Sequence, residues 1–162
     1  MSSPEVSLRP CVDADLAFLS ALYAHTRSAE MAQLGWPAAA VEAFVAQQFA
    51  AQQQHYQSHY GDAQQMIIEA AGEPVGRAYL HWSAAQLHII DISLLPAWQG
   101  QGIGTRLLGQ WLARADASGL LVSLQVLAGN PAQRLYLRHG FQASADDGLY
   151  LHMQRQPLLS AA

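Results

Sequence analysis

Apolar residues recur along this chain at two spacings, every second residue in some stretches and every third or fourth residue in others. Alternation, like a short continuous apolar run, predicts β-strands, whereas the longer spacing predicts helices that bury one face. The stretches predicted as strands are residues 6–9, 66–70, 75–82, 87–95 and 120–127, with two closing strands that begin at residues 141 and 150 around a turn at 146–148.

Four helices are predicted between these strands. Asp13 is the expected N-cap of the first helix, and the second runs through a glutamine-rich segment to Tyr56 or Tyr60. The third helix begins at Ile103, and the fourth begins with Asn130 as its N-cap, followed by a proline. With 162 residues and helices interleaved with strands, the chain is expected to form one α/β domain.

The stretch from residue 87 to residue 105 is the most informative part of the chain. Its apolar run stops at Pro96, glycines follow at positions 100, 102 and 104, and an amphipathic helix begins directly afterwards. A strand, a glycine turn and a helix start direct several backbone N–H groups toward one point in front of the helix. Such a point attracts phosphate, so we interpret the turn as a diphosphate site.

Two common phosphate motifs do not fit this turn. The dinucleotide fingerprint requires a further glycine, but positions 105 and 107 are Thr105 and Leu107. A P-loop requires lysine, and the chain contains none. The spacing of Gln99, Gly102 and Gly104 after Leu-Leu-Pro instead resembles the acetyl-CoA signature of the GCN5-related N-acetyltransferase (GNAT) superfamily.

The resemblance implies a fold and a domain organisation. A GNAT-like fold is a single domain with a mixed, mostly antiparallel central sheet of about seven strands, flanked by helices and splayed after the fourth strand. It implies that residues 1–162 are one N-acetyltransferase domain, with an acceptor-shaping part over about residues 1–62 and an acetyl-CoA-binding core over about residues 63–156.

The resemblance also implies an activity: an acetyl-CoA-dependent N-acetyltransferase that moves an acetyl group to a primary amine by direct attack. Acetyl-CoA is the implied co-substrate, and no metal is expected. Main-chain amides of the splayed strand are expected to hold the pantetheine arm, and Leu94 N–H to polarise the thioester carbonyl. The implied cofactor-binding residues are Ile92, Ser93, Leu94, Gln99, Gly100, Gln101, Gly102, Ile103, Gly104, Thr105 and Asn130.

A second segment, from Asn130 to Phe141, resembles the family's Asn…Leu-Tyr…Gly-Phe motif. By this resemblance Tyr136 is the acid that protonates the departing CoA thiolate, and Asn130 contacts the cofactor. The alternative is that Tyr136 is a packed aromatic and Asn130 only a helix cap.

Several residues are candidates for the base that takes the proton of the amine. Some family members use a glutamate on the fifth strand as the base. This chain has Gln125 at that position, and an amide cannot act as a base. A glutamate used by others on the fourth strand corresponds to His88, which titrates near neutral pH. Asp91 is the second candidate, on the opposite face of the strand by simple alternation unless a bulge intervenes, and His81 is the third. Either of the first two would act directly or through water.

Composition and charge argue against nucleic-acid binding, metal binding and membrane association. The net charge is −4 and the basic residues are eight scattered arginines, so no nucleic-acid stripe is present. His55 and His59 have the spacing of a zinc pair, but no third ligand is evident. No signal or membrane-spanning pattern is found, and Cys11 is the single cysteine, so a cytoplasmic protein without membrane partners is expected.

The expected partner is a small-molecule or peptide amine, and the resemblance adds a homodimer, since dimers are common in the family. The alternative function is a non-catalytic acyl-CoA-binding or sensor module with the same fold. The absence of a carboxylate at Gln125 supports this alternative, and the retained Tyr136 opposes it.

Overall fold

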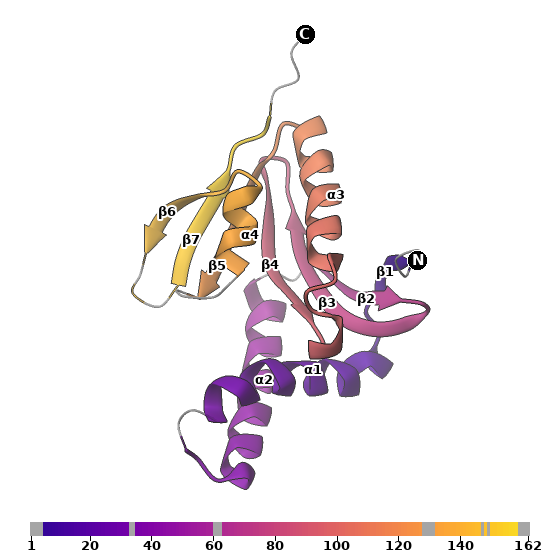
Figure 1. The fold of residues 1–162 in the computed structure, drawn as a ribbon, viewed down its shortest axis with the longest axis vertical. Coiled ribbons are helices and arrows are strands. Elements are labelled where there is room, and N and C mark those ends of the chain that lie inside the picture. The colour runs from indigo at the N-terminus through magenta and orange to yellow at the C-terminus, as the bar shows by residue number, and fades with distance from the viewer. Residues whose placement is uncertain are drawn as a thin grey trace. The chain divides into compact units, whose positions relative to one another are not determined.

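The computed structural model describes residues 5–32, 35–59, 63–127, 132–146, 148 and 150–158. Helices are interleaved with strands along the chain (Figure 1), and the protein has an α/β fold. The elements are β1 (Val6–Pro10), a 3-10 turn η1 (Asp13–Asp15), α1 (Leu16–Ala32), α2 (Ala38–His59), β2 (Gln64–Ala70), β3 (Glu73–Trp82), β4 (Gln86–Leu94), η2 (Pro96–Trp98), α3 (Ile103–Ala117), β5 (Leu121–Leu127), α4 (Ala132–Arg138), β6 (Gln142–Asp146) and β7 (Tyr150–Arg155).

The strands hydrogen-bond in the order β1-β2-β3-β4-β5-β7-β6. The β4–β5 pair is parallel, because α3 connects the two strands, whereas β1–β2, β5–β7 and β6–β7 are antiparallel. The expected seven-stranded mixed sheet is therefore confirmed. Among the described residues, none of the helices has the length and apolar character needed to cross a bilayer.

The chain divides into two compact units, and the border between them passes through β3 and β4. The first unit contains Met1–Tyr79 and Ile92–Gln101, and the second contains Leu80–Asp91 and Gly102–Ala162. The division at about residue 62 into an acceptor-shaping part and an acetyl-CoA-binding core stays a prediction.

In the first unit, α1 and α2 pack through Leu19, Leu22 and Val45, and the rings of Tyr23 and Phe49 lie 5.7 Å apart. The β1–β2 ladder sets Arg9 beside Glu69, and the Arg9 guanidinium bonds both Glu69 and Asp15.

The start of the first helix differs from the prediction. Val12 is the N-cap residue and Asp13 lies inside the 3-10 turn, so Asp13 is not the cap. Asp15 accepts the Val12 N–H at 2.8 Å instead, because Arg9 holds its carboxylate with bonds of 2.8 and 2.9 Å. These two bonds, the larger influence, and the Val12 N–H lower the pKa of Asp15 to about 2.

Two smaller predictions also change. The hairpin between β2 and β3 turns at Ala71 and Gly72, which both have positive φ, so Pro74 belongs to β3. Phe141 is buried ahead of β6 and does not begin that strand. The predicted start of the fourth helix at Asn130, with its proline, lies outside the described residues, as does Tyr60.

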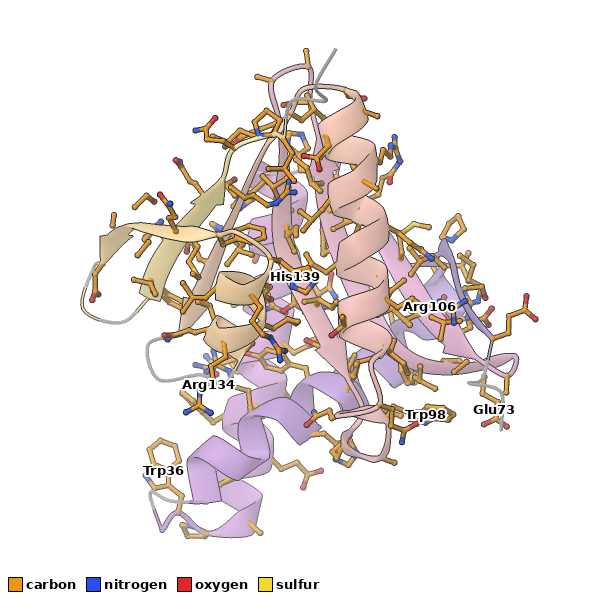
Figure 2. All side chains as sticks on the ribbon, turned by 45° about the horizontal axis from the view of Figure 1, so that its top comes forward. Trp36, Glu73, Trp98, Arg106, Arg134 and His139 are labelled. Atoms are coloured by element: carbon orange, nitrogen blue, oxygen red, sulfur yellow. The ribbon has the colours of Figure 1, made fainter. Side chains whose placement is uncertain are left out.

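In the second unit, the strands have one apolar and one polar face. Leu87, Ile89, Val122, Leu124 and Met153 share a face and are at most 3% exposed. Arg155 lies on this face, opposite Val122, and bonds both Asp116 of α3 and the His139 carbonyl after α4. The two helices therefore cover the apolar face, and Figure 2 labels His139 at the end of α4.

Strand β6 lies at the edge of the sheet, and all five of its residues are exposed. Its register against β7 shifts between Ala143 and Ala145, which is a bulge at Ser144.

Candidate active site

Strands β4 and β5 part halfway along their length. Their parallel ladder runs from Gln86 opposite Leu121 to Ile89 opposite Leu124, yet β4 continues to Leu94 and β5 to Leu127. The expected splay after the fourth strand is therefore confirmed, and it begins directly after Ile89.

Between two of its backbone bonds to β3, the β4 side of the hairpin has one residue more than the facing stretch of β3. The Ser83 N–H donates to the Gln86 carbonyl, and that register continued along the hairpin would bring Leu94 to Val75. The Leu95 N–H donates to the Val75 carbonyl instead, so a bulge lies on β4 between these points. Near its end the strand passes very close to Gly76, where a Cβ would collide with the Ser93 carbonyl oxygen.

The turn after β4 is closed by its own glutamines. Gln99 Nε2 donates to the Leu94 carbonyl at 3.0 Å, and Gln101 Nε2 donates to the Ala97 carbonyl at 2.8 Å. Gly100 and Gly102 have φ values of 74° and 83°, a backbone region that favours glycine, and Gly102 is the N-cap of α3. The side chain of Gln99 thus shapes the turn.

The space beside the glycines fits a ligand that approaches the backbone. A Cβ added at Gly100, Gly102 or Gly104 would meet no atom of the protein within 4 Å. Gly104 lies inside α3, without positive φ, where glycine costs about 1 kcal/mol relative to alanine. The first turn of α3 also leaves backbone N–H groups without intrahelical partners, so the residues present leave both room and donors for a diphosphate lying against the start of α3.

The other predicted cofactor residues differ in exposure. Ile92, Ser93 and Leu94 are half-buried at the end of β4, Thr105 is exposed, and the Ile103 side chain is 5% exposed in the core. Ile103 could therefore reach a ligand through its backbone N–H only. Asn130 lies outside the described residues.

Tyr136 lies on α4 and is only 7% exposed. Its ring packs edge-on against Phe141, with ring centroids 5.6 Å apart. Burial, with a smaller contribution from the negative charge of Asp91, raises the pKa of Tyr136 to about 12. The charge of Asp91 thus reaches Tyr136, and the hydroxyl keeps its proton at neutral pH.

His88 has a different set of neighbours. Its Nδ1 lies 2.8 Å from Ser123 Oγ on β5, directly across the parallel ladder. Burial, together with the nearby His81 and His152, lowers the pKa of His88, and a hydrogen bond with the Ser123 backbone opposes this shift. The imidazole is therefore neutral over a wider range of pH than an exposed histidine.

The two groups lie on opposite faces of the second unit's strands. His88 shares the polar face with Ser123, Gln125 and His152, whereas Tyr136 belongs to α4, which covers the apolar face. Asp91 lies three residues beyond His88 on β4, and the charge of its carboxylate reaches Tyr136.

Ser123 and His152 were missed by the sequence reasoning. The signal was present as polar residues at positions 123 and 125 of an otherwise apolar strand, but the partner of each depends on strand register. The second unit also has a cavity of about 580 Å³ near the end of α4, lined by residues that include Arg138, His139, Gln142 and Gln154. None of the predicted site residues lines it.

Comparison with known proteins gives one family and many similar structures. The profile of the acetyltransferase (GNAT) domain matches residues 61–143. The curated proteins include no relative that the sequence comparison matches.

Three crystal structures illustrate the likeness. PaiA N-acetyltransferase from Thermoplasma acidophilum, in complex with coenzyme A, has a TM-score of 0.72 and 17% identity, over 94% of this chain and 99% of that chain. An acetyltransferase from Thermus thermophilus has a TM-score of 0.69 and 19% identity, over 96% and 99%. A histone acetyltransferase HPA2 and related acetyltransferase from Corynebacterium glutamicum has a TM-score of 0.64 and 20% identity, over 99% and 100%.

At these identities the likeness establishes the fold. The matching profile covers just over half of the chain and includes β4, the glycine turn, α3 and α4. The chain therefore belongs to the GNAT acetyltransferase family.

Proposed function

We propose that the protein transfers an acetyl group from acetyl-CoA to a primary amine by direct attack. The observation that carries this proposal is the open space beside Gly100, Gly102 and Gly104, at the start of α3. The amides of residues 100–105 would hold the diphosphate, and those of Ile92, Ser93 and Leu94 the pantetheine arm. When bound, acetyl-CoA supplies an activated acetyl thioester.

His88 is the proposed base. An alkyl amine has a pKa of about 10 and must lose a proton to attack, so a neutral imidazole is required. Family membership, burial and the lowered pKa of His88 support this assignment. Asp91 is the alternative base, but the negative charge of its carboxylate contributes to the raised pKa of Tyr136, the proposed acid.

Tyr136 is the proposed proton donor to the departing sulfur. As the new N–C bond forms, the electron pair of the C–S bond leaves with sulfur, and the Tyr136 hydroxyl donates to it. A thiol has a pKa of about 8.5, so Tyr136, with a pKa of about 12, is the weaker acid. We expect its main contribution to be a hydrogen bond, with water carrying the amine proton away from His88. Leu94 N–H would polarise the thioester carbonyl.

A pair of glycines on one helix tests the cofactor site. Gly104→Leu should fill the space beside the turn, whereas Gly109→Leu makes the same change one and a half turns further along α3. A Cβ at either glycine meets no protein atom within 4 Å, so each variant should keep or gain stability, by up to about 1 kcal/mol. Thermal unfolding measures this.

Calorimetric titration with CoA then separates the two variants. We expect Gly104→Leu to bind CoA at least about tenfold more weakly, because the ligand no longer reaches the backbone donors, and Gly109→Leu to bind like the wild type. Equal affinities of the two variants would contradict the cofactor site. Intact CoA binding without CoA release over a panel of amines would favour the sensor module.

A further inference from the structure

Ser123 links two residues of the neighbouring strand. His88 and Gln86 are two positions apart on β4, so their side chains share a face, and Ser123 lies directly across the ladder from His88. Ser123 Oγ is 2.8 Å from His88 Nδ1 and 3.2 Å from Gln86 Oε1. These three side chains form a continuous hydrogen-bonded chain.

The number of hydrogens that these three side chains share determines which atom donates in each hydrogen bond. A serine hydroxyl has one hydrogen to donate and lone pairs to accept. The Ser123 hydrogen points to Gln86 Oε1, an acceptor, so the contact with His88 needs its hydrogen from the ring. Nδ1 then carries the proton, and Nε2 carries the lone pair of the neutral imidazole.

We propose that Ser123, oriented by Gln86, is a positioning residue that fixes His88 as the Nδ1–H tautomer, with Nε2 directed to accept the proton of the amine. This inference rests on the proposed function, in which His88 is the base. A single tautomer matters because only the nitrogen that carries the lone pair accepts a proton, and the wrong tautomer presents an N–H at that position.

The opposite direction makes a distinguishable prediction. If Ser123 donated to Nδ1, its hydrogen bond would stabilise the neutral ring, and removing it would raise the pKa of His88. If the ring donates to Ser123, the bond is retained and strengthened in the charged ring, and removing it lowers that pKa. The charged groups that act on His88 are His81 of β3 and His152 of β7, and both stay in place in the variants below.

The experiment is nitrogen NMR on the full-length, isotope-labelled protein, with the His88 signal assigned from a His88→Gln variant. We expect the wild type to show Nδ1 protonated and Nε2 unprotonated at neutral pH, and Ser123→Ala to show a mixture of tautomers. Ser123→Thr, which keeps the hydroxyl on a strand-forming residue, should restore the single tautomer. Ser7→Ala, an exposed serine on β1, is the matched control.

The kinetic readout separates positioning from stability. In Ser123→Ala we expect kcat to fall about tenfold, the rate equivalent of one hydrogen bond, while the KM for acetyl-CoA stays unchanged. In the pH–rate profile of this variant, the acidic limb should move to lower pH. Ser123→Thr should recover most of this rate.

Two outcomes overturn the inference: Nε2 protonated in the wild-type protein, or an acidic limb that moves to higher pH in Ser123→Ala. The NMR result needs no turnover. If the protein shows the expected His88 tautomer but acetylates no amine, the proposed function is contradicted. The inference that Ser123 positions His88 would still hold.

Discussion

The strands of the second unit present two faces with opposite properties. One face is apolar, is covered by α3 and α4, and has Tyr136 above it; the other carries His88, His152 and Ser123, which are half-buried. Burial raises the pKa of Tyr136 and lowers that of His88, because a low-dielectric surrounding disfavours whichever form is charged. Desolvation therefore favours the neutral hydroxyl of Tyr136 on one face and the neutral imidazole of His88 on the other.

The end of the pairing between β4 and β5 lies close to the border between the two faces. Because β4 and β5 part after Ile89, the strands that separate the two faces stop pairing close to His88 and Asp91. The proposed base and the proposed proton donor therefore lie on the two faces that these strands separate.

The largest expected effect is the loss of the ion pair that ties the covered face together. Arg155 bonds both carboxylate oxygens of Asp116, at 2.8 and 3.1 Å, and is 6% exposed. Arg155→Leu should lower the free energy of unfolding by about 3 kcal/mol, the lower end for a broken buried pair, since Asp116 is partly exposed. Denaturant unfolding measures this, with the exposed Arg134→Leu on α4 (Figure 2) as the control.

The stability that Arg155→Leu removes depends on pH, and the sign of this dependence follows from the pKa of Asp116. The Arg155 hydrogen bonds, the larger influence, and the Leu158 N–H lower the pKa of Asp116. Its contribution to stability is therefore fully present above the unfolded pKa of about 3.9 and is lost as the pH falls through the folded pKa. The difference between wild type and Arg155→Leu should be constant near neutral pH and shrink below about pH 4. A difference that grows in acid would contradict this assignment.

The next effect concerns the donor on the covered face. Tyr136→Phe keeps the ring and its contact with Phe141 but removes the hydroxyl. We expect kcat to fall about a hundredfold, the cost of removing one donor to a developing charge, with unchanged CoA affinity and melting temperature. Tyr79→Phe is the matched control, since Tyr79 is also buried with a pKa raised by burial. An unchanged rate in Tyr136→Phe would remove this residue from the mechanism.

The smallest effect concerns the polar face. After burial, His81 is the largest influence that lowers the pKa of His88. His81→Gln should therefore raise that pKa and move the acidic limb of kcat/KM to higher pH by a fraction of a unit, while catalysis persists. His139→Gln, whose Nδ1 lies 2.8 Å from the Leu135 carbonyl, is the control. Loss of the acidic limb in His81→Gln would instead make His81 the base.

The elements of the fold were largely predictable from the sequence because they depend on local patterns. The glycine turn, the run before Pro96 and the amphipathic face of α3 each follow from neighbouring residues. Even so, the choice between Asp13 and Asp15 as the capping group required knowing that Arg9 reaches Asp15, which depends on how β1 leads into the turn.

The candidate site was predictable only in part because its groups come from separate strands. The motif nominated Tyr136, but nothing in the sequence placed Asp91 beside it. Ser123 gains its meaning only from the register that sets it opposite His88. A shift of one residue would turn the entire polar set to the other face, and sequence alone does not fix the register of two parallel strands.

The bulge at Ser144 has a consequence for how molecules of this protein meet one another. An edge strand with regular backbone groups is a template on which another chain can add a strand. In β6 the register shift interrupts that template in the middle, and Asp146 adds a charge near its end. The exposed margin of the sheet is thus a poor seed for aggregation, and the bulge that makes it so becomes visible only in the strand register.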